Sequence, residues 1–330
     1  MLGFLLRRLG ASLLLLLFVL TVTFFLLRLV PGDPTRLSED SRISLEQQQN
    51  LKRIYGLDRP LPEQYLLWLR AVVLHGDWGI SFSQQRPVSA VIAEAIPATL
   101  LLAATALLVE YGVGFLLGVA AARRQGTAVD HLIRIGSLLI FSQPIFWFGL
   151  MAILLFSYVW PLFPAGHMYS IGAQEMGGGA RFLDLLYHLV LPAAVLGLWS
   201  TGATARFVRG SLLDAMGRDY IRTARAKGLP ERRVVWVHGM RNALTPVIQL
   251  FAMQLPTLLN GSLITEVIFS WPGLGRLIFT SILTRDYPVV LATTAMSAIF
   301  VLLGNLLGDL LQAVSDPTLR TVSDPAVRDA

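Results

Sequence analysis

Apolar residues form six long runs along the chain, separated by polar segments. A helix that crosses the hydrocarbon core of a bilayer needs about 20 mostly apolar residues, and each run reaches this length. The fourth run is the weakest because Gly, Ser and Thr interrupt it. The pattern predicts an all-α polytopic membrane protein with about six transmembrane helices. The six runs are Leu9–Val30, Pro97–Ala122, Leu132–Trp160, Tyr187–Phe207, Ala243–Ile268 and Val289–Val314.

The first run has the features of a transmembrane helix rather than of a secretory signal. A secretory signal has an apolar core of roughly 7–15 residues followed by small residues at a cleavage site. The first run is longer, and the Val-Pro-Gly-Asp-Pro sequence at residues 30–34 offers no such site. We therefore expect residues 1–30 to form an uncleaved N-terminal transmembrane helix.

The composition supports a membrane protein. Hydrophobic residues make up 54% of the 330 residues and charged residues 15%, with a mean hydropathy of +0.61. Soluble domains carry about 45–50% apolar and about 25% charged residues, so a soluble enzyme and a disordered chain are both excluded. The sequence contains no cysteine, which excludes disulfides, iron–sulfur clusters and thiolate zinc sites.

The distribution of Lys and Arg predicts the orientation. Loops on the cytoplasmic side of a membrane carry an excess of these residues. If the N-terminus is cytoplasmic, most of the Lys and Arg residues fall on that side, including nine between Arg206 and Arg241. Both termini are then cytoplasmic. The net charge of +6 reflects topology and does not indicate nucleic-acid binding.

Four regions follow from this topology. Residues 1–30 form the first span, and residues 31–96 form an extracytoplasmic segment with helices expected at Leu45–Ile54 and from Pro60 onward. Residues 97–314 form the membrane core, in which Pro144, Pro192 and Pro256 are expected to kink or interrupt their spans. Residues 315–330 form a cytoplasmic tail.

The polar loop between the fourth and fifth spans, about residues 209–241, is the most informative part of the chain. Asp219 suits the start of a helix, Lys227 and Gly228 suit its end, and Pro230 suits the first turn of another. These residues predict a cytoplasmic helix of about two turns. Small residues on this helix would let another protein approach closely; alternatively, the basic loop only enforces topology.

The loop and three other segments resemble one protein family. The sequence from Tyr220 to Leu229, followed by Arg-Asn-Ala-Leu-x-Pro at 241–246, resembles the cytoplasmic "EAA" loop of ABC importer permeases. The resemblance is to the dipeptide/oligopeptide (DppB/OppB-type) permease subunit, although Arg222 stands where the wider motif has Glu. The other matching segments are Pro-Gly-Asp-Pro at 31–34, His-Gly-Asp-Trp-Gly at 75–79, and the region 266–288.

The resemblance implies a type I ABC importer permease fold and a passive role as half of the translocation pathway for peptides. It implies a second homologous permease subunit, two ATP-binding subunits and an extracytoplasmic binding protein, in a bacterial or archaeal plasma (inner) membrane. The cargo could equally be glutathione or a nickel chelate. The two-turn helix would be the coupling helix that docks on the ATPase subunit. The residues implied in coupling are Asp219, Tyr220, Thr223, Ala224, Arg225, Ala226, Lys227 and Gly228.

The chain has no ATP-binding loop of its own. Such a loop needs a lysine followed by Ser or Thr after a glycine-rich turn. Lys52 and Lys227, the two lysines of the sequence, have no such neighbours. We expect no enzymatic activity, bound cofactor or metal here, and we expect ATP and Mg²⁺ on partner subunits.

Polar and small residues within the spans leave alternatives open. Glu110 lies near the middle of the second span, where it could line the pathway or could be a protonated or hydrogen-bonded interior group. Two Gly-x-x-x-Gly pairs, at 114–118 and 304–308, could pack helices within the chain or contact a second permease. A stand-alone secondary transporter would show paired intramembrane charges and internal repeats, which the sequence lacks.

Overall fold

The computed structural model describes residues 2–29 and 58–315, with side chains left undescribed at some positions within the helices. In these ranges the regular structure is helical, apart from one isolated bridge between Ile80 and Pro87. The helix expected at Leu45–Ile54 and the tail from 316 lie outside the described residues. The chain divides into two compact units, each of which is described separately below.

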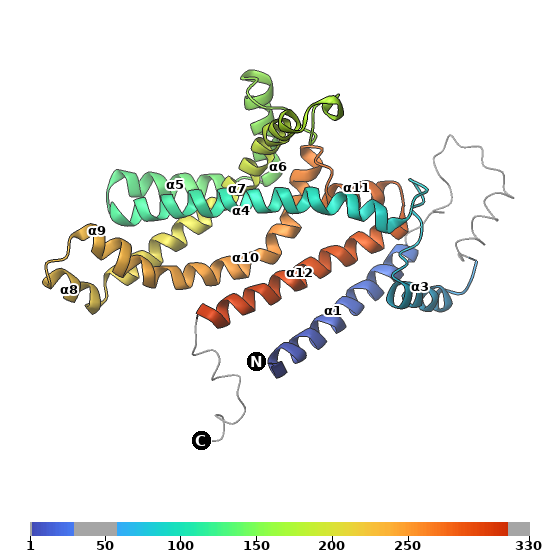
Figure 1. Cartoon of the computed structure of the whole chain (residues 1–330), viewed down its shortest axis with the longest axis horizontal. Helices are drawn as coiled ribbons and strands as arrows, with labels where there is room; N and C mark the ends of the chain where they lie inside the picture. Colours follow the sequence, from blue (N-terminus) through green and yellow to red (C-terminus); the bar gives the residue numbers. More distant parts are fainter. Residues whose placement is uncertain (1, 30–57, 316–330) are drawn as a thin grey trace. The chain divides into compact units, whose positions relative to one another are not determined.

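Unit 1 comprises the chain up to Thr99 together with Pro272–Phe300. It contains α1 (Leu2–Leu29), α3 (Leu61–His75), the start of α4 (Val88–Arg123), α11 (Leu274–Leu283) and the first half of α12 (Tyr287–Ser315) (Figure 1). Its core joins α4, α11 and α12. The buried side chains of this core are Val88, Ile92, Ala95, Leu274, Val289 and Ala292.

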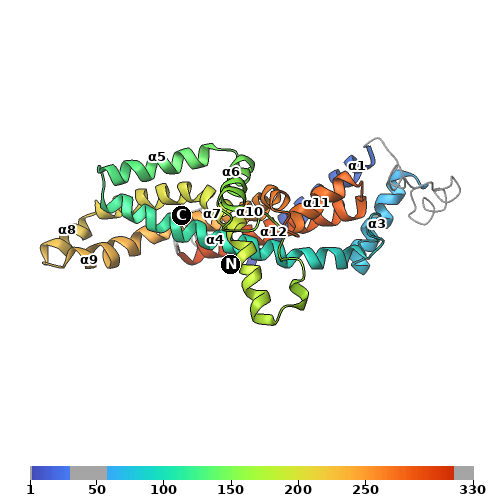
Figure 2. The same cartoon turned by 90° about the horizontal axis from the view of Figure 1, so that it is seen from above.

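Unit 2 comprises Leu100–Trp271 and the chain from Val301. After the rest of α4 it contains α5 (Ala128–Ser142), α6 (Ile145–Ile153), the π-helix η1 (Leu154–Val159), the short η2 (Ala173–Glu175) and α7 (Gly178–Met216). There follow α8 (Asp219–Ala226), α9 (Glu231–Arg233), the π-helix η3 (Val234–Gly239) and α10 (Met240–Ile268). Helices α5 and α10 both pack along α7 (Figure 2).

Helices cover all six apolar runs. Among the described residues, four helices are long and apolar enough to cross a membrane: Gly10–Leu29, Val88–Arg123, Gly178–Met216 and Tyr287–Leu311. A fifth candidate is the pair made by α5 and α6–η1, which is bent by 99°. The fifth run lies in α10, in which the side chains at positions 252 and 255–262 are not described. Helices α4 and α7 both begin nine residues before the runs predicted from the sequence.

The bend in the third run has a local cause. Proline disfavours a helical conformation at the residue before it. Gln143, which precedes Pro144, is extended with φ −82° and ψ 140°, and α5 ends there. The interruption expected at Pro144 is therefore confirmed. Pro192, in contrast, is buried inside α7, which continues as one helix from Gly178 to Met216.

Glycines bring α4 and α7 unusually close together. A Cβ added at Gly118 of α4 would lie 2.6 Å from the backbone oxygen of Ala205, and one added at Gly114 would lie 2.9 Å from the side chain of Thr204. On the α7 side, a Cβ at Gly197 would lie 2.6 Å from the backbone oxygen of Ala106. The Gly-x-x-x-Gly pair at 114–118 thus packs two helices of the same chain against each other.

Candidate functional site

Helix α8 stands at one end of unit 2, beyond the ends of α7 and α10 (Figure 1). Asp219 is its first-turn acid, which suits the positive end of the helix dipole. The helix ends at Ala226, and Gly228 follows in the left-handed conformation with φ +76°. The next helix, α9, begins directly after Pro230. The helix bounds predicted from these residues are therefore confirmed.

One face of α8 is buried against the chain itself. Ile221 is fully buried and Ala224 is 5% exposed, and both pack against Val234 of η3. The small side chain of Ala224 thus serves the chain's own core and is not available as a contact surface. The other residues implied in coupling are all exposed: Asp219, Tyr220, Thr223, Arg225, Ala226, Lys227 and Gly228.

An ion pair links α8 to α9. The Arg225 guanidinium donates to both carboxylate oxygens of Glu231, at 2.7 Å and 3.2 Å. This hydrogen bonding holds the pKa of the Glu231 carboxyl below its usual range. Both side chains are about half exposed, so the pair orients the loop more than it stabilises the fold. Arg222, whose side chain is 78% exposed, forms an ion pair with Asp219 at 3.4 Å on the outside of the loop.

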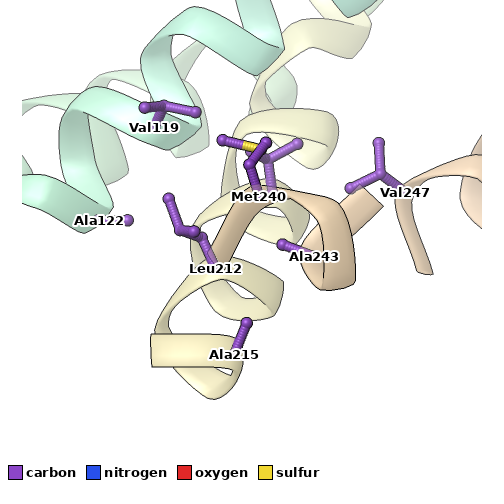
Figure 3. Close-up of a cluster of buried hydrophobic side chains, with 8 residues drawn as sticks. Val119, Ala122, Leu212, Ala215, Met240, Ala243 and Val247 are labelled. Carbon is purple, nitrogen blue, oxygen red and sulfur yellow. The ribbon is translucent and has the colours of Figure 1, made fainter. Parts of the chain in front are cut away.

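A cluster of buried side chains packs together α7 and α10, the two long helices on either side of α8 in the chain. It joins α4, α7 and α10 near the ends of α7 and α10 that lead to α8, and it is called the packed base below (Figure 3). Its buried members are Val119, Ala122, Val208, Leu212, Ala215, Met240, Ala243 and Val247. Beside this base lies an open cavity of about 830 Å³, bordered by α7, Tyr220 and the start of α10. Because the base is packed, displacement of α8 would be transmitted to α7 and α10.

A buried ion pair attaches the α4–α5 turn to α7. Arg209 of α7 donates to both oxygens of Asp130 at 2.7 Å and 2.8 Å, and the Gly126 backbone N–H donates to Asp130 at 3.0 Å. The Asp130 side chain is 1% exposed and that of Arg209 is 19% exposed. Because the contact between Arg209 and Asp130 is bidentate, it restricts rotation of α7 relative to α5.

Comparison with known proteins identifies the family. The family described as "Binding-protein-dependent transport system inner membrane component" matches residues 114–321, and the N-terminal model of the same transport systems matches residues 1–103. The chain belongs to this family. It is therefore a membrane-embedded transport subunit with the type I ABC permease fold, and such permeases work in a complex with other subunits.

Curated relatives match the permease over nearly its whole length. The dipeptide transport system permease protein DppB of Escherichia coli K12 is 40% identical over 337 residues, covering 97% of this chain and 99% of that protein. The oligopeptide permease protein AppB of Bacillus subtilis is 38% identical over 320 residues, with the same coverage. The di/tripeptide permease protein DppB of Pseudomonas aeruginosa is 38% identical over 335 residues, again with the same coverage.

Glu110 lies inside the α4–α7 contact of the permease. Its side chain is fully buried, and one carboxyl oxygen accepts a hydrogen bond of 2.8 Å from the Thr204 hydroxyl. The other oxygen has no hydrogen-bond partner among the described residues. Glu110 is not among the residues lining the cavity beside α8. These surroundings are those expected for a hydrogen-bonded interior group, which is one of the two roles that the sequence left open for Glu110.

Sequence reasoning did not identify two carboxylate contacts. The first is the Asp130–Arg209 pair, whose members are 79 residues apart. The second is Asp286 in unit 1, which is fully buried and accepts hydrogen bonds from the Ser81 hydroxyl (2.5 Å), the Phe82 N–H (3.0 Å) and the Ser83 N–H and hydroxyl (3.0 and 2.7 Å). In the sequence, each of these contacts was marked only by a single acid near a short polar turn. Asp130 follows the polar residues 123–127, and Asp286 precedes Tyr287.

Proposed function

We propose that this permease forms half of the translocation pathway of an ATP-driven importer of peptides. The names of its full-length relatives refer to dipeptide, di/tripeptide and oligopeptide transport. A zwitterionic peptide cannot cross hydrocarbon unaided, because burying unpaired charge costs many kcal/mol. A second homologous permease would complete the pathway, and an extracytoplasmic binding protein would deliver the cargo. Nickel chelates and glutathione are the alternative cargoes within this proposal.

We further propose that α8 is the coupling helix through which separate ATP-binding subunits, two per complex, move the permease. The observation that carries this proposal is the division of α8 into two faces. Its inner face, at Ile221 and Ala224, packs against Val234 of η3, while its outer face is exposed and carries several basic residues. Guanidinium groups such as that of Arg222 pair readily with carboxylates, so the expected docking groove on the ATPase is acidic.

This assignment places α8 and both termini in the cytoplasm, and the segment 31–96 outside. ATP and Mg²⁺ would bind to the partner subunits. For Glu110 we propose the role of an interior group that holds α4 to α7 rather than a contact for peptide. The full burial of Glu110 and its bond to Thr204 support this role.

The test replaces one exposed residue of α8 and one matched residue elsewhere. Ala226→Arg puts a large charged side chain on the outer face of α8. Ala128→Arg makes the same change at an exposed position in the first turn of α5, on the same proposed side of the membrane. Permease, ATPase subunits and binding protein are reconstituted in liposomes with a labelled dipeptide. We expect Ala226→Arg to lose ATPase subunits on purification and to lose uptake, while Ala128→Arg keeps both.

Normal uptake by Ala226→Arg would contradict coupling through α8. Ala224→Arg is not suitable for this test, since Ala224 is buried against Val234 and the variant would disturb folding. The stand-alone alternative is tested with the permease alone. Concentrative uptake without any ATP-hydrolysing subunit would support a secondary transporter.

A further inference from the structure

Helix α3 exposes an apolar face although it belongs to the segment between the first two spans. Pro60 and Pro62 fix its start, and Gly76, in the left-handed conformation with φ 61°, ends it. The inner face carries Gln64, Tyr65 and Trp68. The outer face carries three large aliphatic side chains that are 63–68% exposed and one exposed arginine: Leu66, Val73, Leu74 and Arg70.

The inner face of α3 is fixed to the last turns of α1. The ring of Phe24 lies 5.4 Å from the rings of Tyr65 and Trp68, and the ring of Phe25 lies 5.5 Å from that of Tyr65. The hydroxyl groups of Thr21 and Tyr65 are hydrogen-bonded at 2.7 Å. Figure 1 shows α3 beside the end of α1 that is far from the N-terminus.

The depth of these contacts follows from the length of α1. Its apolar stretch Gly10–Leu29 has 20 residues, which matches the hydrocarbon core of about 30 Å. Thr21 lies eight residues before the end of that stretch, or about 12 Å along the helix axis at 1.5 Å per residue. A helix whose Tyr65 contacts Thr21 therefore reaches with that side chain into the hydrocarbon of its leaflet and does not lie in free solution.

Lipid also covers the neighbouring surface. On α1, Leu14 is 71% exposed, Phe18 65% and Leu26 57%, and a membrane-spanning helix places such side chains in lipid. The outer face of α3 adjoins this surface through the contacts at Phe24 and Phe25. Arg70 can extend its charged end toward the headgroups while its stem remains among the apolar side chains.

We propose that α3 is an interfacial helix whose outer face binds the lipid of the leaflet at the Leu29 end of α1. In the proposed orientation this is the outer leaflet. Lipid is the occupant favoured here because the α3 face continues the exposed apolar surface of a helix long and apolar enough to cross the membrane. The proposal depends on α1 crossing the membrane and not on the cargo or on α8.

The absence of cysteine from the sequence makes a direct test possible. Leu66→Cys, Val73→Cys and Leu74→Cys are each spin-labelled in the complete transporter, reconstituted in phospholipid nanodiscs. Leu14→Cys serves as the lipid-exposed reference. Gln84→Cys serves as the water-exposed reference, since residue 84 is exposed in the loop after α3. Electron paramagnetic resonance then compares relaxation by oxygen, which concentrates in lipid, with relaxation by a water-soluble nickel chelate.

We expect the three α3 labels to be relaxed by oxygen more than by nickel, as at position 14, and the label at position 84 to show the reverse. Nickel-dominated relaxation at Leu66 and Val73 would overturn the proposal, because it would place this face in water. Labels that neither reagent reaches would also overturn it, because they would show that another protein covers the face. Each variant is first checked for normal assembly by size-exclusion chromatography.

Discussion

Gly118 and Gly112 lie on the same helix, α4, but a methyl group added to each meets opposite surroundings. At Gly118 a Cβ would lie 2.6 Å from the carbonyl oxygen of Ala205 and 2.7 Å from the Cβ of Val208. Non-bonded carbon atoms attract each other best at about 3.5–4.0 Å. At Gly112 a Cβ would have no heavy atom within 4 Å. The two positions therefore form a matched pair for a Gly→Ala substitution.

The expected effects on the free energy of unfolding have opposite signs. Gly118→Ala forces α7 away from α4, and overpacking of this kind costs about 1–3 kcal/mol. Because the closest atom belongs to the backbone of Ala205, no side-chain rotation relieves the clash. Gly112→Ala gains up to about 1 kcal/mol, since alanine is the better helix former. We expect the two variants to differ by about 1–4 kcal/mol.

Unfolding of the purified permease is followed by circular dichroism during titration of mixed micelles with SDS. Gly197→Ala repeats the test from α7, where a Cβ would lie 2.6 Å from the carbonyl oxygen of Ala106. It should be destabilised like Gly118→Ala. If Gly118→Ala and Gly112→Ala unfold at the same SDS fraction, the close approach of α4 and α7 is refuted.

Three further predictions concern carboxylates. Asp130→Asn and Arg209→Gln should each lower the thermal unfolding temperature, since each single variant leaves a partner buried and unpaired. The double variant should lose less than the sum of the two single losses. Additive losses would contradict a direct pair. The Glu231 carboxyl, with its lowered pKa, should stabilise α8–α9 above its ordinary pKa of about 4.3 and lose this effect as the pH falls through the lowered value. Glu231→Gln should therefore show a smaller acid-induced fall in thermal stability than the unsubstituted chain. Glu110→Gln should take up peptide normally across pH, since the amide oxygen can still accept the one hydroxyl bond; an altered pH profile of uptake would favour a pathway role.

Much of the fold could be predicted because lipid imposes a simple length rule. Apolar runs of sufficient length mark helices wherever they occur, and the break at Pro144 follows from the chemistry of proline alone. The exact ends could not be predicted in the same way. Helices α4 and α7 extend nine residues beyond their apolar runs, at Val88 and Gly178, because a helix continues through isolated charged residues such as Glu94 and Asp184 that interrupt an apolar run.

The candidate site was predictable in position but not in orientation. Asp219, Gly228 and Pro230 determine where α8 begins and ends through local backbone chemistry. Which side of a two-turn helix faces inward depends on tertiary contacts, and Ala224 faces Val234 of η3, a contact that no local pattern reveals. The same holds for Asp130 and Arg209, since nothing local pairs residues 79 positions apart.

The glycine contacts also bear on how a second permease could bind. Small-residue motifs allow close helix packing, and the sequence left open whether they act within the chain or between subunits. Gly114 and Gly118 are already packed against Thr204, Ala205 and Val208 of the same chain. A second permease that used these glycines would first have to displace helices of this chain. The Gly114–Gly118 pair therefore serves the subunit's own packing of α4 against α7.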